Sequence, residues 1–163
     1  MTTAKTRDPA DAADCVCFNL RKATRSITHI YDAALRPSGL RATQFTVLTV
    51  VERLSPACVT KIADLSVIDR TTLTRSLALL ESDGLIRRVP SADVRERLYA
   101  LTARGVRTLE RAAPLWHAAQ TRVIDILGPT RVRRLLGDLE TVVRTGRVAK
   151  AERVRHAAQR RRA

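Results

Sequence analysis

Apolar positions recur at intervals of three and four along residues 15–35 of the amino-acid sequence. This spacing predicts an amphipathic helix. Asp11 or Asp14 could cap its first turn, and the segment 37–39, Pro-Ser-Gly, ends it. In residues 43–54 the apolar positions cover most of the helical circumference, which is typical of a helix at the centre of a domain.

Two shorter helices follow the break at Ser55-Pro56. The first spans residues 59–65. The second begins after Asp69, an acidic side chain at a predicted N-cap, and ends at Asp83-Gly84, where Gly84 is expected to adopt a left-handed conformation. Leucines repeat along this second helix at spacings of four and three, which predicts one buried stripe. The stripe consists of Leu73, Leu77 and Leu80.

A β-hairpin is predicted next, with strands at residues 85–89 and 97–101 and a polar turn between them. Thr102 then caps a long helix over residues 103–127, which Pro114 is expected to kink. A last helix follows Gly128-Pro129 and carries its own apolar stripe. The stripe consists of Val132, Leu135, Leu136, Leu139, Val142 and Val143.

This order of elements predicts a mainly α-helical fold with a small β-hairpin wing. Three short helices followed by a hairpin form a winged helix-turn-helix, and the long helices on either side form a helical dimerisation region. An α-helix fits the major groove of DNA, and a hairpin beside it reaches a minor groove or a phosphate strand. The pattern therefore favours a DNA-binding protein.

The charge of the chain supports this interpretation, although its total alone does not establish it. The 163 residues include 30 Lys and Arg against 16 Asp and Glu, a net charge of +14, which favours a polyanionic partner. Only four of the basic residues are lysine, so coding bias could contribute to the excess. Residues 70–107, which cover the predicted recognition helix and wing, contain eight arginines and four acidic residues.

Other classes of protein are disfavoured by the sequence. An apolar content of 45% argues against a disordered chain. No apolar run approaches the roughly 18 residues of a membrane helix, and the polar N-terminus lacks a signal-peptide core, so a cytoplasmic protein without membrane association is expected. Three cysteines do not make a disulfide framework, and no phosphate loop, dinucleotide fingerprint or metal-ligand spacing is present. We therefore expect no cofactor, no metal and no enzymatic activity.

Four stretches together resemble the multiple-antibiotic-resistance regulator (MarR) family of bacterial winged-helix proteins. They lie in order with family-like spacing. They are residues 39–48 (Gly-Leu-Arg-Ala-Thr-Gln-Phe followed by Val-Leu), 62–75 (Ile-Ala-Asp-Leu and Arg-Thr-Thr-Leu-Thr-Arg), 79–88 (Leu-Leu-Glu-Ser-Asp-Gly-Leu-Ile-Arg-Arg), and 93–105 (Asp-Val-Arg and Tyr-Ala-Leu-Thr-Ala-Arg-Gly).

The resemblance implies a homodimeric transcription factor, a repressor that binds double-stranded DNA at a pseudo-palindromic operator. Residues 1–13 are then a flexible N-terminus and 14–145 a single domain. Within it, 14–36 and 103–145 supply the dimerisation helices and 41–102 the winged helix. Residues 146–163 remain as a basic C-terminal extension, either a solubilising tail or a phosphate-contacting arm.

The resemblance also assigns roles to individual residues. The recognition helix would present Thr71, Thr72, Thr74 and Arg75 to the major groove, and Arg95 would enter the minor groove while Asp93 orients a wing arginine through a charge-assisted bond. Contacts to phosphate or bases are expected from Arg70, Arg97, Thr60 and Lys61.

Two kinds of regulation are compatible with the sequence. The family resemblance implies a pocket for a small phenolic or aromatic effector, which His29, Tyr31, Phe45, Trp116 and His117 could line, although these residues could equally be ordinary core. Alternatively, Cys17-Phe18-Asn19-Leu20 with Tyr31 is similar to the organic-hydroperoxide-sensing branch, in which such a cysteine is reactive. Arg21 replaces a second tyrosine of that branch. Cys17 would then be a redox sensor, or simply a buried apolar residue.

A third interpretation belongs to another class of function. A strongly basic chain could be an architectural or nonspecific DNA-binding protein whose affinity depends on charge alone. The patterned recognition helix and wing argue against it. Preference for one DNA sequence over random duplex distinguishes the two classes.

Overall fold

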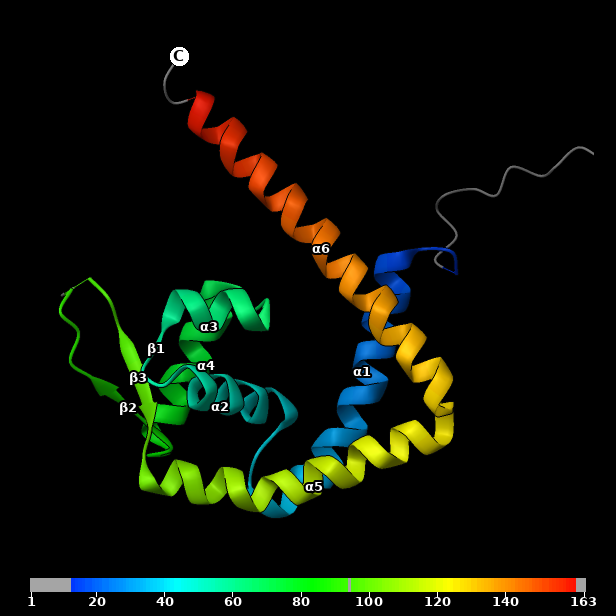
Figure 1. Cartoon of the computed structure of the whole chain (residues 1–163), viewed down its shortest axis with the longest axis horizontal. Coiled ribbons are helices and arrows are strands. Elements are labelled where there is room, and N and C mark those ends of the chain that lie inside the picture. Colours follow the sequence, from blue (N-terminus) through cyan, green and yellow to red (C-terminus); the bar gives the residue numbers. More distant parts are fainter. Residues whose placement is uncertain (1–12, 94, 161–163) are drawn as a thin grey trace, which may run out of the picture. The chain divides into compact units, whose positions relative to one another are not determined.

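The computed structural model describes residues 13–93 and 95–160 (Figure 1). Asp11, one of the two predicted helix caps, and Val94 of the wing lie outside the described residues. Within helix α5 (Ala103–Leu127) the chain divides into two compact units, Met1–Ala119 and Gln120–Ala163, and each is described separately.

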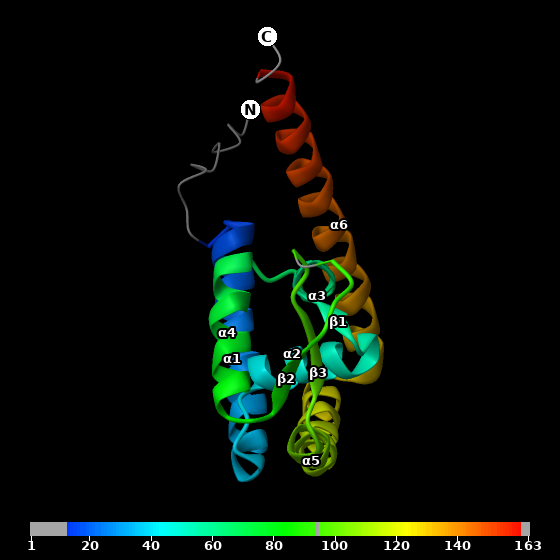
Figure 2. The ribbon, with the colours of Figure 1, turned by 90° about the vertical axis from the view of Figure 1, so that its left-hand side faces the viewer.

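The first unit begins with four helices and one 3₁₀ turn. They are α1 (Val16–Leu35), η1 (Arg36–Ser38), α2 (Ala42–Leu54), α3 (Val59–Ser66) and α4 (Arg70–Ser82). Every helix of this set was predicted from the sequence to within about two residues. Figures 1 and 2 show α2 between α3 and the first half of α5, as its nearly continuous apolar surface requires.

The N-terminal cap of α1 differs from the prediction. Asp14 is not the N-cap; the N-cap residue is Cys15, in an extended conformation, and its Sγ accepts a hydrogen bond from the backbone N–H of Phe18 at 3.5 Å. Thiols are weak acceptors, so the sequence preference for Asp pointed to the wrong residue. Cys15 lies outside the helix, so helical geometry does not determine the direction of its side chain relative to that of Cys17.

A small antiparallel sheet follows, with strand order β1-β3-β2. The predicted hairpin is confirmed as β2 (Ile86–Val89) and β3 (Leu98–Leu101). The two-residue strand β1 (Ala57–Cys58) was not predicted, and it pairs Ala57 with Tyr99. The hairpin projects from the body of the first unit with its tip free (Figure 1).

One core joins the helices to the sheet. The three leucines of the predicted α4 stripe are fully buried with Val47, Leu48 and Val51 of α2 and with Ile62 of α3. Ile86 and Tyr99 bring the sheet into the same cluster. Because α4 and the base of the hairpin share this core, the end of the hairpin nearest the helix is held in a fixed relation to α4.

The turn after α4 is locked to the start of α5 (Ala103–Leu127). Gly84 has a φ of 68°, as predicted for the end of the helix. The Thr102 hydroxyl donates to the Gly84 carbonyl at 2.7 Å and accepts from the Gly105 N–H at 3.0 Å, which confirms Thr102 as a cap. A Cβ at Gly105 would lie 2.0 Å from the Leu85 carbonyl oxygen, so only glycine permits this approach.

Pro114 lies inside α5, and the helix continues on both sides of it. In the second unit, α6 spans Pro129–Arg160. The apolar stripe predicted for α6 is present, but of its six members only Val132 is buried, and the other five are 36–56% exposed. Such a row of exposed apolar side chains is typical of a surface that a partner covers.

Among the described residues, no helix has the length and apolar character needed to cross a membrane.

Candidate nucleic-acid interface

The predicted recognition helix α4 is exposed to solvent on the side opposite its buried stripe and on both flanks. Its buried stripe occupies one side, and helical geometry places Thr71 and Arg75 on the side directly opposite, where both are exposed. Thr72 lies on one flank. Arg70 and Thr74 lie on the other flank, toward the wing. The predicted contact residues are therefore spread over the outward face of the helix and both of its flanks.

The start of α4 is fixed by the predicted cap. Asp69 Oδ1 accepts a hydrogen bond from the Thr72 N–H at 2.9 Å. Hydrogen bonds from the Thr72 side chain and backbone hold the pKa of the Asp69 carboxyl below its usual value. The Thr74 hydroxyl donates to the Arg70 carbonyl at 2.7 Å, which leaves its lone pairs facing outward. The cap thus sets the direction in which the first turn of α4 presents its side chains.

The wing tip is organised differently from the prediction. Asp93 Oδ1 accepts a hydrogen bond from the backbone N–H of Arg95 at 2.9 Å, and the Glu96 N–H donates to the Asp93 carbonyl oxygen at 2.9 Å. The predicted bond from Asp93 to a wing guanidinium is not present among the residues that the structure describes. An aspartate bonds readily to the backbone two residues on, so Asp93 shapes the turn instead. Arg95 and Arg97 remain exposed.

A hollow of about 230 Å³ separates α4 from the wing. Three guanidinium groups and one carboxylate, Glu96, line it, so its charge balance favours an anion such as a phosphate. The lining residues are Cys58, Val59, Thr60, Arg70, Thr74, Leu77, Arg95, Glu96, Arg97 and Tyr99.

The amino end of α3 completes this surface. Arg70 Nη2 donates to Thr60 Oγ1 at 3.4 Å, which links the starts of α3 and α4. Lys61 is exposed, and its backbone N–H donates to the Sγ of Cys58, the N-cap of α3, at 3.5 Å. Five of the ten predicted contact residues, Thr60, Arg70, Thr74, Arg95 and Arg97, thus line one hollow. Thr71, Arg75 and Lys61 are exposed elsewhere on the same two helices.

One contact at this surface was not predicted. Arg88 Nε of β2 lies 3.3 Å from Glu81 Oε1 near the end of α4. The side chain of Tyr99, the cross-strand partner of Arg88, also interacts with its guanidinium. The pKa of Arg88 is raised above its ordinary value, first by Tyr99 and then by Glu81. Sequence spacing alone does not reveal this link, because it depends on the strand register.

The predicted effector residues do not all come together. Trp116 stacks on Phe45 with ring centroids 5.9 Å apart, and Tyr31 and His117 contact the same indole at 6.4 and 5.0 Å. Burial raises the pKa of Tyr31. These four rings pack against one another.

His29 does not share that cluster. It lines a separate hollow of about 590 Å³ together with Asp32, Arg36 and Arg41. The Asp32 carboxylate in this hollow accepts a hydrogen bond from the Ala42 N–H at 2.7 Å, which fixes the first turn of α2.

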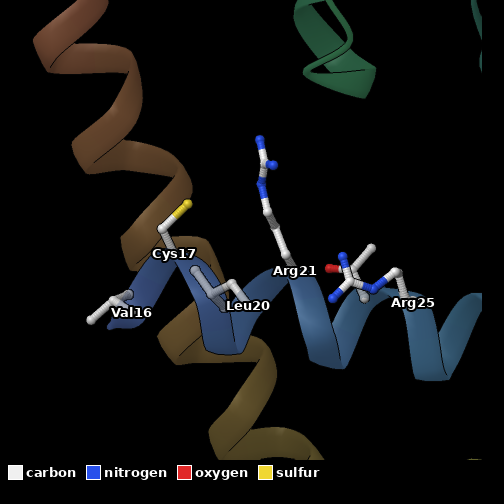
Figure 3. A pocket seen from close by; sticks show the side chains of 6 residues that line it. Val16, Cys17, Leu20, Arg21 and Arg25 are labelled. Carbon is white, nitrogen blue, oxygen red and sulfur yellow. The ribbon is translucent and has the colours of Figure 1, made fainter. Parts of the chain in front are cut away.

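Cys17 is exposed on the first turn of α1. Figure 3 shows its sulfur and the Arg21 side chain on the same side of the helix, where both line an open hollow of about 670 Å³. In a single chain Cys17 is therefore not buried, and its part in sensing stays a prediction. Its thiol is accessible to a small oxidant.

A recognition helix with its polar face outward, beside a hairpin tipped with arginines, defines a winged-helix DNA-binding transcriptional regulator. The MarR family model matches residues 40–96. The M. tuberculosis transcriptional regulator MosR, solved in complex with DNA, is 40% identical, with a TM-score of 0.72, and the match covers 82% of this chain and 99% of that one. The chain therefore belongs to the MarR family.

A second relative extends the comparison. The transcriptional repressor CouR has been solved with p-coumaroyl-CoA (26% identity, TM-score 0.75, covering 85% of this chain and 98% of that one). It has also been solved with a 23-mer DNA duplex (28% identity, TM-score 0.71, covering 83% and 96%). No curated protein matches the chain in a sequence comparison.

Proposed function

We propose that this chain is a homodimeric repressor that binds a pseudo-palindromic DNA operator. The observation that carries the proposal is the arrangement of arginines about the hollow between α4 and the wing, with Thr71 and Arg75 exposed on the outward face of α4. Insertion of α4 into the major groove would bring Arg95 to the adjacent minor groove, where arginine is favoured. DNA-bound structures of MosR and CouR support this arrangement.

The dimer follows from the apolar surface that one chain leaves uncovered. Leu135, Leu136, Leu139, Val142 and Val143 of α6 are exposed, and so are Val16 and Phe18 of α1. A second copy would bury these side chains through a two-fold interface. The two recognition helices would then lie roughly 34 Å apart, one turn of DNA.

Competition between DNA sequences tests the proposal. Fluorescence anisotropy would be measured with a labelled duplex from the intergenic region upstream of the gene, at physiological salt, with unlabelled upstream or random duplex of equal length as competitor. A regulator should be displaced by the upstream duplex at a concentration at least about a thousandfold lower. Equal displacement by both duplexes would show a nonspecific, architectural DNA-binding protein instead.

Release by a small aromatic effector is the regulation we propose first. The ring cluster of Tyr31, Phe45, Trp116 and His117 joins α1, α2 and α5, so a ligand that separated these rings would shift the helices that support α4. CouR in complex with p-coumaroyl-CoA supports an aromatic acid or its thioester. An effector that binds the DNA-incompetent geometry better lowers DNA affinity by linkage.

The accessible thiol supports an alternative mode of release. The Cys17 thiolate would attack the O–O bond of an organic hydroperoxide, giving a sulfenic acid at Cys17 and the corresponding alcohol. Its exposure and the open hollow that it shares with Arg21 permit this approach. The added oxygen would alter the first turn of α1.

A single treatment separates the two modes. Cumene hydroperoxide would be added to the operator complex of the wild type, of Cys17→Ser, and of Cys58→Ser as a matched control. The thiol mechanism requires release of the wild type and of the Cys58 variant but not of the Cys17 variant. If all three are released, or none, Cys17 has no sensing role.

A further inference from the structure

A three-membered contact ties the wing to the recognition helix. Arg88 on β2 forms an ion pair with Glu81 on α4 at 3.3 Å, and its guanidinium also interacts with Tyr99, its cross-strand partner on β3. The side chains of Arg88 and Glu81 are 58% and 32% exposed. Exposed ion pairs add little to folding stability. We therefore expect this contact to affect the orientation of the wing more than the free energy of unfolding.

The strand register explains why these groups meet. Tyr99 pairs with Ala57 of β1 on one side and with Arg88 of β2 on the other. Directly paired residues of antiparallel strands present their side chains on the same face of a sheet. Ala57 and Tyr99 are buried, so this face points toward the core, and Arg88 occupies its edge. The buried tyrosine thus places the guanidinium within reach of α4.

The matching surface of α4 is a single ridge. Arg70, Thr74, Leu77 and Glu81 are separated by four, three and four residues and therefore lie on one side of the helix. The first three line the hollow between α4 and the wing, together with Tyr99. Figure 2 shows the hairpin rising beside α4 from the turn that joins them. Glu81 holds the wing at the opposite end of this ridge from Arg70.

Arg88 is the outermost anchor of the hairpin on the β2 side. The base of β2 is fixed where Thr102 bonds to Gly84 and Leu85 and where Gly105 approaches the Leu85 carbonyl. After Arg88 only one further residue pair, Val89 with Leu98, precedes the turn. The orientation of the tip, which carries Arg95, therefore depends on the last contact that β2 makes with the helix.

We propose that Arg88 is a positioning residue for operator binding, which sets the wing against the recognition helix by joining Glu81 of α4 to Tyr99 of β3. This inference rests on the proposed DNA-binding function. It assigns to Glu81, an acidic residue at a DNA-binding surface, a favourable effect on DNA affinity.

The direction in which Glu81→Gln changes operator affinity separates this role from a direct phosphate contact by Arg88. Replacing Glu81 by glutamine removes a negative charge near DNA and would by electrostatics alone strengthen binding. If Glu81 acts through Arg88 to orient the wing, Glu81→Gln weakens operator binding instead. Tyr99→Phe removes only a hydroxyl and should act in the same direction. Arg87→Gln is the matched control, since Arg87 is exposed on the opposite face of β2 and carries the same charge as Arg88.

The experiment measures two quantities for the wild type, Glu81→Gln, Arg88→Gln, Tyr99→Phe and Arg87→Gln. The first is operator affinity by fluorescence anisotropy, with circular dichroism to establish folding. The second is amide hydrogen exchange in the wing without DNA. We expect Glu81→Gln and Arg88→Gln to weaken operator binding roughly fivefold and to speed exchange in residues 86–101, while Arg87→Gln leaves exchange unchanged.

Two outcomes would overturn the inference. One is tighter or unchanged operator binding by Glu81→Gln, and the other is wing exchange in Glu81→Gln and Arg88→Gln equal to that of the wild type. Failure of the proposed function has a different signature, since the wild type itself would then show no preference for the upstream duplex. The exchange measurement needs no DNA and would still decide whether Arg88 positions the wing.

Discussion

The indole of Trp116 stacks on the ring of Phe45, with planes only 15° from parallel. This contact joins α5 to α2, and α2 is the helix on which α3 and α4 pack. Offset stacking of two rings adds to the stabilisation from their burial. The pair therefore connects the long helix that continues into the second unit with the scaffold of the recognition helix.

Phe45→Ala should lower the free energy of unfolding by about 2–4 kcal/mol, because it removes a half-buried ring together with its stacking contact with Trp116. Trp116 is the single tryptophan of the chain, so its emission reports this contact directly and should shift to longer wavelength. Urea unfolding followed by fluorescence measures both. Phe45→Leu, which keeps most of the volume, should show a smaller loss, and equal losses would exclude a contribution from stacking.

Gly105→Ala should destabilise the first unit by about 1–3 kcal/mol or more, because the added methyl group would meet the Leu85 carbonyl oxygen. Thermal unfolding measures the change. Gly137→Ala provides the control, since Gly137 lies inside α6 with no atom near its added Cβ, and alanine there should stabilise by about 0.5–1 kcal/mol. A Gly105 variant as stable as the wild type would contradict the close approach.

The Asp69 cap should make the free energy of unfolding depend on pH in the acidic range. The folded-state pKa of Asp69 is lowered by hydrogen bonds from Thr72, so its carboxylate stabilises the fold above the unfolded-state pKa of about 3.9. This contribution is lost as the pH falls through the lower, folded-state pKa. Urea midpoints of the wild type and of Asp69→Ala should therefore differ at pH 6 and converge toward pH 2. A constant difference over that range would exclude the titration of Asp69.

Arg95→Ala should weaken operator binding by about 1–3 kcal/mol and lower the dependence of log K on log salt by about one. The reason is the loss of one guanidinium from the minor groove. Gel-shift titrations at several salt concentrations measure both quantities. Arg107→Ala removes the same charge from α5, at an exposed residue that does not line the hollow between α4 and the wing, and should leave the salt dependence nearly unchanged. Equal effects of the two substitutions would remove Arg95 from the interface.

Deleting residues 146–163 tests the basic C-terminal extension. The segment contains seven basic residues and one acid. If it contacts phosphates, the deletion should lower the salt dependence by about two or more and weaken random duplex as much as operator. A full-length variant with these basic residues changed to glutamine should behave like the deletion. Binding unchanged by either alteration would identify the segment as a solubilising tail.

Features set by local chemistry were predictable from the sequence. The cap bonds of Asp69 with the Thr72 N–H, of Gly84 with the Glu81 carbonyl and of Thr102 with the Gly105 N–H each span three residues, and all three helix ends were located correctly. The two-residue strand β1 could not be found in this way, because it exists only through its pairing with Tyr99, about 40 residues later. The contact between Glu81 and Arg88 escaped prediction for a related reason, since it requires the strand register.

The candidate site shows the same division. The exposed face of α4 follows from the position of its leucines, and that part of the interface was predicted. The bond that Asp93 makes in the structure was not predicted, because a nearby backbone N–H competes for its carboxylate more readily than a long side chain. The separation of His29 from Tyr31 could have been foreseen, since residues two apart on one helix point to nearly opposite sides.

The exposed apolar side chains of α6 carry a consequence for the cell. If they are buried only in the dimer, folding and association are a single equilibrium, and stability rises with the number of copies present. A bacterium that makes few copies would hold a larger fraction as incompetent monomers. Repression would then begin only above a threshold of synthesis, and the sharpness of that threshold would depend on one row of leucines and valines on α6.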